Sequence, residues 1–214
     1  MTGARVRVLL VDDHAVVRAG YRLLLKQAPE IEVVAEAATG EQACSAFAAH
    51  RPDVVVMDLS LPGISGLEAL RRILARDPAA RVLVFSMHED ALFVERALAA
   101  GARGYIAKSS APTVLVDAVK RVAGGEVLVD PGLASRLHAH RARGADTPFG
   151  ALSTREFEIF CLLAEGLSSN DIARRLALSP KTVANYASQI KDKLGAGTTA
   201  ELARLAIRHG LVRP

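Results

Sequence analysis

Short apolar runs separated by longer segments with helical periodicity constrain the first 125 residues more than any other feature of the sequence. Five runs rich in β-branched residues stand at Val6–Val11, Ile31–Ala35, Val54–Met57, Val82–Phe85 and Gly104–Ile106. Strands that alternate with helices in this way predict a parallel sheet with helices on both faces. The uninterrupted apolar character of Val-Val-Val-Met and Val-Leu-Val-Phe is typical of strands that are covered on both sides. We therefore expect an α/β fold, a doubly wound five-stranded parallel sheet.

The segments between the runs predict five helices, at about Ala15–Gln27, Glu41–His50, Gly66–Arg76, Ala91–Ala100 and Pro112–Gly124. Aromatic residues make up only 4% of the chain and there is no Trp, so the core has to be built from Ala, Val and Leu. Hydrophobic residues make up 50% of the chain, which excludes a wholly disordered protein.

A second domain is expected after a break in this alternation. Residues 1–125 form the first domain, residues 126–149 form a linker with a short helix near Leu133–Arg141, and residues 150–214 form an all-α domain. Helix-capping signals begin with a capping box at Ser153-Thr154-Arg155-Glu156. Four short helices are predicted, at Phe157–Glu165, Asp171–Leu176, Lys181–Leu194 and Thr199–His209.

Charge and cysteine content narrow the function classes. Residues 151–214 carry nine basic and six acidic side chains, which hints at an anionic partner such as nucleic acid. Cys44 and Cys161 stand among apolar neighbours with no C-x-x-C motif, which favours buried free thiols over zinc or redox chemistry. The sequence shows no signal peptide and no membrane-spanning segment, so we expect a cytoplasmic protein with no membrane partner.

Polar side chains follow four of the five predicted strands. Asp12 and Asp13 come after the first strand, Asp58 after the third, Ser86 after the fourth and Lys108 after the fifth. The carboxyl ends of parallel strands meet at one edge of the sheet, which is where ligands bind in open α/β folds. The second strand contributes nothing of this kind, as expected of a strand at the sheet edge.

This set of side chains permits a narrow chemistry. Clustered carboxylates favour a hard divalent cation, and carboxylate plus water ligands suit Mg²⁺. A carboxylate is also a nucleophile that can accept a phosphoryl group, and Lys108 can then stabilise the charge on the phosphoryl oxygens.

The residues around these positions resemble the receiver domain of bacterial response regulators. The similar segments are Val-Asp-Asp-His at 11–14, Val-Val-Met-Asp-Leu-Ser-Leu-Pro-Gly at 55–63, Phe-Ser-Met-His at 85–88 and Gly-Tyr-Ile-Ala-Lys at 104–108. The resemblance implies that Asp58 is the phosphoacceptor and that Mg²⁺ is held by Asp13, Asp58 and the backbone carbonyl of Ser60, with Asp12 acting through water. It also implies that Lys108 binds the phosphoryl group, and that Ser86 and Tyr105 form a switch in which Tyr105 follows Ser86 inward.

Each assignment has a structural alternative. Asp12 or Asp13 could cap the helix that begins near His14, and Asp58 could stabilise the turn before Pro62-Gly63. Lys108 could be a surface lysine, Ser86 a capping hydroxyl and Tyr105 a core residue. His14 and His88 flank the site, and we expect both in solvent-facing loops because Mg²⁺ prefers oxygen ligands.

The helix predicted at Lys181–Leu194 has one apolar and one polar face. Val183, Ala187, Ile190 and Leu194 share the apolar face at 100° per residue. A polar face on a helix that follows a short turn is the geometry of helix-turn-helix recognition. The side chains expected to contact DNA are Lys181, Thr182, Ala184, Asn185, Ser188, Gln189 and Lys191.

Residues 150–214 resemble a LuxR-type helix-turn-helix domain. The similar segments are Leu-Ser-Thr-Arg-Glu-Phe-Glu at 152–158, Gly-Leu-Ser-Ser-Asn-Asp-Ile-Ala at 166–173 and Leu-Ser-Pro-Lys-Thr-Val-Ala-Asn-Tyr at 178–186. Small neutral residues stand at 184 and 188, where relatives often carry basic ones, which bears on the DNA contacts rather than on the fold. The last helix resembles the family's dimerisation helix, through Leu202, Leu205, Ala206 and His209; the alternative is packing within its own domain.

The two modules in this order resemble a NarL/FixJ-type two-component response regulator. The resemblance implies that a histidine kinase phosphorylates Asp58, and that this controls dimerisation, sequence-specific binding to double-stranded DNA and transcription. RNA polymerase is a further candidate partner, and no enzymatic role is expected. Two other classes are open to a chain with these residues. One is a phosphoaspartyl hydrolase, but Ser60 occupies the position where such an enzyme needs its acid-base carboxylate. The other is a phosphorylation-independent regulator, and the complete acidic set argues against it.

Overall fold

The computed structural model describes residues 5–142, 148–209 and 211–212. The chain forms two compact units, residues 1–140 and 141–214, and each is described by itself. The predicted boundaries at 125 and 150 are not tested by this division, and residues 143–147 of the predicted linker lie outside the described residues.

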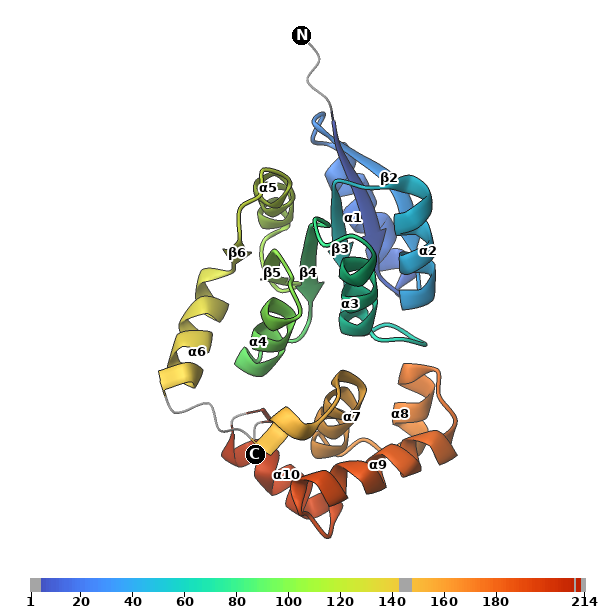
Figure 1. Ribbon diagram of the computed structural model, residues 1–214, viewed down its shortest axis with the longest axis vertical. Coiled ribbons are helices and arrows are strands. Elements are labelled where there is room, and N and C mark those ends of the chain that lie inside the picture. Colours follow the sequence, from blue (N-terminus) through green and yellow to red (C-terminus); the bar gives the residue numbers. More distant parts are fainter. Residues whose placement is uncertain (1–4, 143–147, 210, 213–214) are drawn as a thin grey trace. The chain divides into compact units, whose positions relative to one another are not determined.

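The first unit is built on a parallel sheet with the strand order β2-β1-β3-β4-β5-β6 (Figure 1). The strands are β1 Val6–Val11, β2 Ile31–Ala37, β3 Val54–Met57, β4 Val82–Ser86, β5 Gly104–Ala107 and β6 Leu128–Val129. As expected, β2 lies at an edge. The predicted count of five strands is wrong, because Leu128 and Val129 extend the sheet beyond β5. A strand of only two residues, which starts three residues after the Gly124-Gly125 turn, gives no periodic signal in the sequence.

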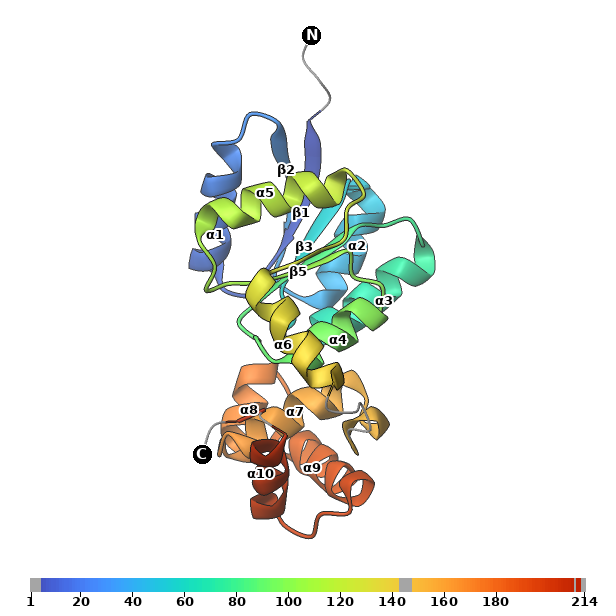
Figure 2. The ribbon, with the colours of Figure 1, turned by 90° about the vertical axis from the view of Figure 1, so that its left-hand side faces the viewer.

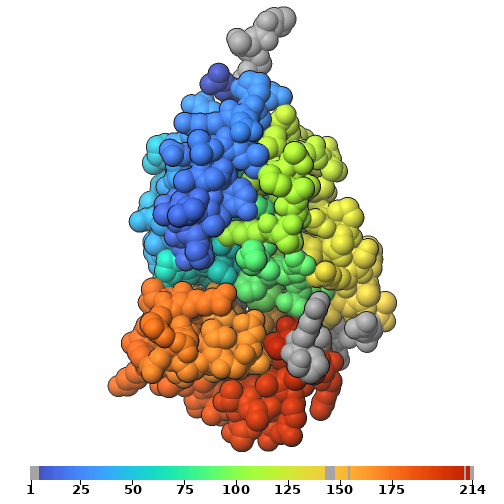
Figure 3. Space-filling model, turned by 180° about the vertical axis from the view of Figure 1, so that it is seen from behind, coloured from blue at the N-terminus to red at the C-terminus, as the bar shows by residue number. Residues whose placement is uncertain are grey.

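Six helices accompany the sheet: α1 Ala15–Lys26, α2 Gly40–His50, α3 Gly66–Arg76, α4 Ala91–Ala99, α5 Pro112–Ala123 and α6 Pro131–Ala142. One face of the sheet is covered by α1 and α5, which lie side by side, and the other face by α2, α3 and α4 (Figures 2 and 3). The core between α1, α5 and the sheet contains β-branched side chains of the central strands, and Tyr21 packs edge-on against Phe85 with ring centroids 4.7 Å apart. Two covered faces explain why the central strands are apolar throughout.

The start of α3 lies unusually close to the backbone of Asp58. The Gly66 N–H donates to the carbonyl of Leu59 at 3.0 Å, and a Cβ at Gly66 would lie 1.8 Å from the carbonyl oxygen of Asp58. Glycine is therefore required here by the close approach of two backbone segments rather than by a left-handed conformation.

We expect Gly66→Ala to destabilise the protein by about 1–3 kcal/mol, because the added methyl group must push the Asp58 backbone aside. The matched control is Gly20→Ala in α1, where an added Cβ meets nothing within 4 Å. This control should be neutral or stabilise the helix by about 0.5–1 kcal/mol. Urea unfolding of both variants measures the difference, and equal midpoints would contradict the close approach.

The second unit consists of α7 Thr154–Ala164, α8 Ser169–Leu176, α9 Pro180–Leu194 and α10 Thr199–Arg208, preceded by a 3₁₀ turn, η1, at Pro148–Ala151. Its core contains the rings of Phe149, Phe157 and Phe160. The predicted capping box is present: Ser153 Oγ accepts from the Glu156 N–H, and the Glu156 carboxylate accepts from the Ser153 N–H.

The sequence also predicts buried free thiols and no membrane-spanning segment. Both cysteines are free, but only Cys161 is buried, whereas Cys44 is half-buried between α2 and α3. Among the described helices, none has the length and apolar character needed to cross a membrane.

Candidate functional site

The carboxyl edge of the sheet brings an ammonium group between two buried carboxylates. Asp12 directly follows β1, Asp58 follows β3 and Lys108 follows β5. Lys108 Nζ lies 2.6 Å from Asp12 Oδ2 and 2.5 Å from Asp58 Oδ2, and all three side chains are less than a tenth exposed. Lys108 is therefore not a surface lysine, and the alternative of a simple turn role for Asp58 does not account for this contact.

Burial and charge act in opposite directions on these groups. Burial raises the pKa of Asp58, and Lys108 opposes this shift by its charge and its hydrogen bond. For Lys108, burial disfavours the charged form, but the carboxylates of Asp58 and Asp12 outweigh it and raise its pKa. The ionised pair is thus mutually dependent, because each charge is tolerated in the buried site only while the other is present.

Asp13 adds a third carboxylate on the outer side of the cluster. One ligand atom each of Asp12, Asp13 and His14 lies within 4.8 Å of the others. Asp13 Oδ1 is a buried oxygen that accepts no hydrogen bond, although His14 Nδ1 lies 2.7 Å from it. Three carboxylates and one ammonium leave two negative charges uncompensated, and this donor set fits a hard divalent cation. The alternative role of capping the helix near His14 holds in part for Asp12, because its Oδ1 accepts a hydrogen bond from the His14 N–H at 2.8 Å, just before α1.

The last residue of β4, Ser86, is fully buried beside Tyr105. Ser86 Oγ accepts from the His88 N–H at 3.3 Å, and the Tyr105 hydroxyl donates to the His88 carbonyl at 2.7 Å. Tyr105 has no exposed surface, and burial raises the pKa of its hydroxyl. The predicted switch tyrosine therefore already points inward in this structure.

His14 is exposed over 66% of its side chain as expected, whereas His88 is only half-exposed in its loop. The His88 ring stacks on Phe93 of α4 with centroids 4.0 Å apart, and its Nε2 lies 2.9 Å from Ser60 Oγ. Ser60 is two residues beyond Asp58, and its N–H donates to Asp58 Oδ1 at 3.3 Å. The sequence gives no signal for this Ser60–His88 contact, because the two residues are far apart in the chain and come together only when β3 pairs with β4.

The second unit presents the predicted polar face of α9 to solvent. The exposed side chains on it include Lys181, Ala184, Asn185, Ser188 and Gln189, whereas Lys191 is half-buried. The opposite face is anchored in the core by Val183 and Ile190, which are fully buried. Thr182 has a capping role, because its N–H and hydroxyl both contact Ser179 Oγ, at 3.0 and 2.8 Å.

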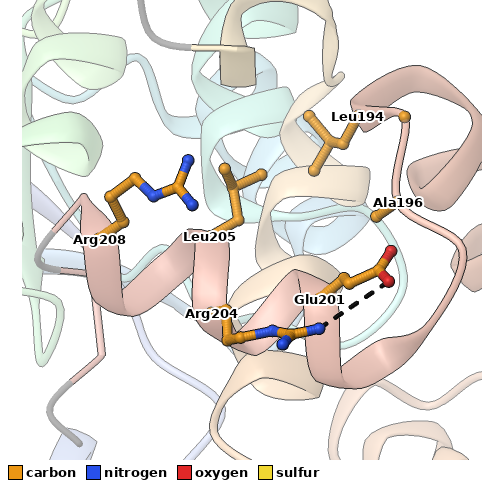
Figure 4. A pocket seen from close by; sticks show the side chains of 7 residues that line it. Leu194, Ala196, Glu201, Arg204, Leu205 and Arg208 are labelled. Carbon is orange, nitrogen blue, oxygen red and sulfur yellow. Dashed lines mark ion pairs between the residues drawn. The ribbon is translucent and has the colours of Figure 1, made fainter.

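Three of the four residues predicted for dimerisation are used inside their own domain. Leu202 and Ala206 are fully buried, and the His209 ring packs edge-on against Phe149 with centroids 5.1 Å apart. This is the alternative that the sequence left open. Leu205 is half-buried and lines a hollow with Leu194, Ala196, Glu201, Arg204 and Arg208 (Figure 4).

Comparison with protein families matches both units. Residues 8–120 match the response regulator receiver domain, and residues 150–206 match the bacterial regulatory proteins of the luxR family.

Whole proteins match over nearly the full length of the chain. Transcriptional activator protein ExaE of Pseudomonas putida is 42% identical over 96% of this chain and 98% of its own. Response regulator GacA of Pseudomonas aeruginosa is 38% identical over 97% and 98%.

Two solved structures extend the comparison. A LuxR-family two-component response regulator from Aurantimonas is 44% identical over 65% of this chain and 99% of its own, with a TM-score of 0.63. The RcsB response regulator in complex with DNA is 25% identical over 94% of this chain and 97% of its own, with a TM-score of 0.60.

Proposed function

The chain belongs to the NarL/FixJ-type response regulators, and on this basis we propose that phosphorylation of Asp58 controls its binding to DNA. Members of this family carry a receiver domain and a LuxR-type DNA-binding domain, and they are transcription regulators rather than enzymes. The proposal includes a cognate histidine kinase as the phosphoryl donor and a cytoplasmic location for this chain. It also includes the domain division at 1–125, 126–149 and 150–214.

The observation that carries the proposal is the contact of Lys108 with Asp12 and Asp58 at the carboxyl edge of the sheet. Asp58 needs no general base, because an ionised carboxylate is already a nucleophile. An Asp58 oxygen attacks the phosphorus atom, the bond from phosphorus to the donor nitrogen or oxygen breaks, and the donor leaves with the electron pair. Lys108 then holds the phosphoryl oxygens by charge.

Asp13, Asp58 and the Ser60 carbonyl would hold Mg²⁺, with Asp12 contributing through water. The cation would supply positive charge for the oxygens of the transferred phosphoryl group. The buried Asp13 oxygen without a hydrogen bond and the two uncompensated negative charges of the cluster support this assignment.

Adding Mg²⁺ should stabilise the protein against thermal unfolding even without a phosphodonor. At ten times the dissociation constant, binding to the folded state adds about 1.4 kcal/mol. Asp13→Asn should lose this stabilisation, whereas Asp117→Asn, at an exposed carboxylate of α5, should keep it. Scanning calorimetry with and without Mg²⁺ measures the shift, and a full shift in Asp13→Asn would remove Asp13 from the site.

The output of the proposed switch is DNA binding by α9. Asn185 and Gln189 carry amides that can read adenine edges, while Lys181 and Lys191 can hold phosphates. The similarity to the DNA-bound RcsB structure supports double-stranded DNA as the ligand. Phosphorylation would favour a homodimer that binds two half-sites about one helical turn apart, with RNA polymerase as a further partner.

The test uses a duplex selected from a random-sequence pool by the full-length protein after treatment with acetyl phosphate and Mg²⁺. Wild-type affinity for this duplex should rise on phosphodonor treatment, measured by fluorescence anisotropy at fixed salt. Asp58→Asn should show the untreated affinity with and without the donor. A donor-dependent rise in Asp58→Asn would overturn the proposal.

A further inference from the structure

Helix α6 follows β6 and is docked on the first unit by one face. Leu133 and Leu137 are buried, and Arg136 and His140 lie on the same face at helical spacing. Ser135 and His138 are exposed on the other side. The docked face contacts α4 and the loop before it, since Arg136 reaches Glu89 at 3.0 Å and His140 Nε2 lies 3.8 Å from Glu95.

Glu89 joins α6 to the turn that carries Lys108. Its Oε1 accepts from Ser109 Oγ at 2.5 Å, and its Oε2 accepts from Arg136 Nη1 at 3.0 Å. Arg136 Nη1 also donates to the Glu89 carbonyl at 3.3 Å. Ser109 is the residue after Lys108, and Glu89 is three residues after Ser86. The Ser109 hydrogen bond is the largest influence that lowers the pKa of Glu89, and Arg136 adds to it.

A second, independent contact links the same turn to the start of α6. Ser110 Oγ donates to Asp130 Oδ2 at 2.9 Å. The other carboxylate oxygen, Asp130 Oδ1, accepts from the Gly132 N–H at 2.9 Å, and the Asp130 carbonyl accepts from the Ala134 N–H at 2.8 Å. Ser110 is thus bonded to Asp130, the residue before α6, and Ser109 is linked through Glu89 to Arg136 in the second turn of α6.

From these contacts we propose that the docking of α6 on the receiver domain depends on the position of Lys108. Phosphorylation of Asp58 then weakens the Ser109–Glu89–Arg136 and Ser110–Asp130 contacts and releases α6 from the receiver domain. The inference rests on the proposed function and adds the element that carries the signal toward the second unit.

The direction follows from what Lys108 contacts in this structure. Its ammonium lies between Asp12 and Asp58. Ser109 and Ser110 directly follow Lys108 in the chain, so their positions depend on where the Lys108 backbone lies. A phosphoryl group bonded to a carboxylate oxygen of Asp58 places a larger anionic group next to the Lys108 ammonium, and Lys108 has to shift to bind it. Because coupling is reciprocal, undocking α6 must favour phosphorylation by the same factor by which phosphorylation favours undocking.

The experiment measures amide hydrogen exchange in the full-length protein, in peptides covering residues 131–142. Each sample is incubated with Mg²⁺, with and without acetyl phosphate, and its phosphorylation is measured on a phosphate-affinity gel. Arg136→Ala is compared with His138→Ala, a matched control on the exposed face of α6. Leu137→Ala, which removes a buried anchor, gives the exchange rate of the undocked helix.

In the wild type, phosphorylation should speed α6 exchange at least about fivefold, the lower end of typical coupling. Unphosphorylated Arg136→Ala should exchange faster than wild type and should reach a higher phosphorylated fraction at the same acetyl phosphate concentration, and His138→Ala should match the wild type in both. Phosphorylated wild type with unchanged α6 exchange overturns the inference and leaves the proposed function standing. Equal behaviour of Arg136→Ala and His138→Ala also overturns it. Absence of phosphorylated wild type overturns both.

Discussion

Replacing Lys108 with alanine is expected to destabilise the folded protein by about 3–5 kcal/mol at neutral pH, the usual effect of removing one partner from a buried ion pair. Lys108 Nζ is the shared partner of Asp12 Oδ2 and Asp58 Oδ2, and both carboxylates are buried. Without the ammonium, two like charges remain next to each other with little access to water. The same variant should lose nearly all phosphoryl transfer, because no cationic side chain is left on the phosphoryl oxygens.

The pH dependence gives this prediction a specific sign. Burial raises the pKa of Asp58, and Lys108 is what opposes that shift. Removing Lys108 raises the Asp58 pKa further, so the variant gains protons more readily than wild type as the pH falls. The stability difference between the two should therefore be largest at neutral pH and should shrink below the raised pKa of Asp58.

A matched lysine at the surface provides the control. Lys120 lies 2.9 Å from Glu30, but both side chains are at least 40% exposed. Lys120→Ala should cost only about 0–1 kcal/mol, because water replaces a surface partner. Urea unfolding of both variants between acid and neutral pH measures this, and a Lys108→Ala cost as small as that of Lys120→Ala would mean that the buried ion pair does not form.

The second large effect is expected on α9. Asn185→Ala should weaken binding to the selected duplex by about 1–3 kcal/mol, or roughly 5- to 150-fold, if its amide reads a base edge. It should leave binding to an unrelated duplex unchanged. Lys181→Ala should weaken both kinds of binding alike and reduce the salt slope by about one, because a phosphate contact carries no sequence information.

Lys193 is the control for the α9 lysines. Its ammonium lies 2.7 Å from the buried Glu156 carboxylate at the start of α7, so its charge is engaged within the domain. Lys193→Ala should leave the salt slope of DNA binding unchanged. Anisotropy titrations over a range of salt separate these outcomes. An Asn185→Ala loss that is equal on both duplexes would assign Asn185 to backbone contacts instead.

Local signals in the sequence predict much of this fold. The Ser153–Glu156 capping box forms because both partners lie within one helical turn, and the helix of Pro180–Leu194 begins after the Ser179 cap as expected. The order of strands places Asp12, Asp58 and Lys108 at one edge, because parallel strands share the direction of their carboxyl ends.

What the sequence does not predict depends on tertiary contacts. The bridge from Ser60 to His88 needs β3 and β4 in register, and the inward position of Tyr105 depends on the His88 carbonyl that receives its hydroxyl. An apolar stripe on α10 is equally compatible with a dimer interface and with a core. Only the positions of Phe149 and the other helices show that Leu202 and Ala206 are buried within the domain.

The central claim is that Asp58 accepts the phosphoryl group, and the most direct measurement is phosphate-affinity gel electrophoresis after incubation with acetyl phosphate and Mg²⁺. The account predicts a retarded band for the wild type, and no retarded band for Asp58→Asn, whose amide is not a nucleophile. Asp53→Asn, at a carboxylate bonded to the Arg7 N–H away from the site, should shift like the wild type. A retarded band of equal intensity in Asp58→Asn would place the acceptor elsewhere and contradict the account.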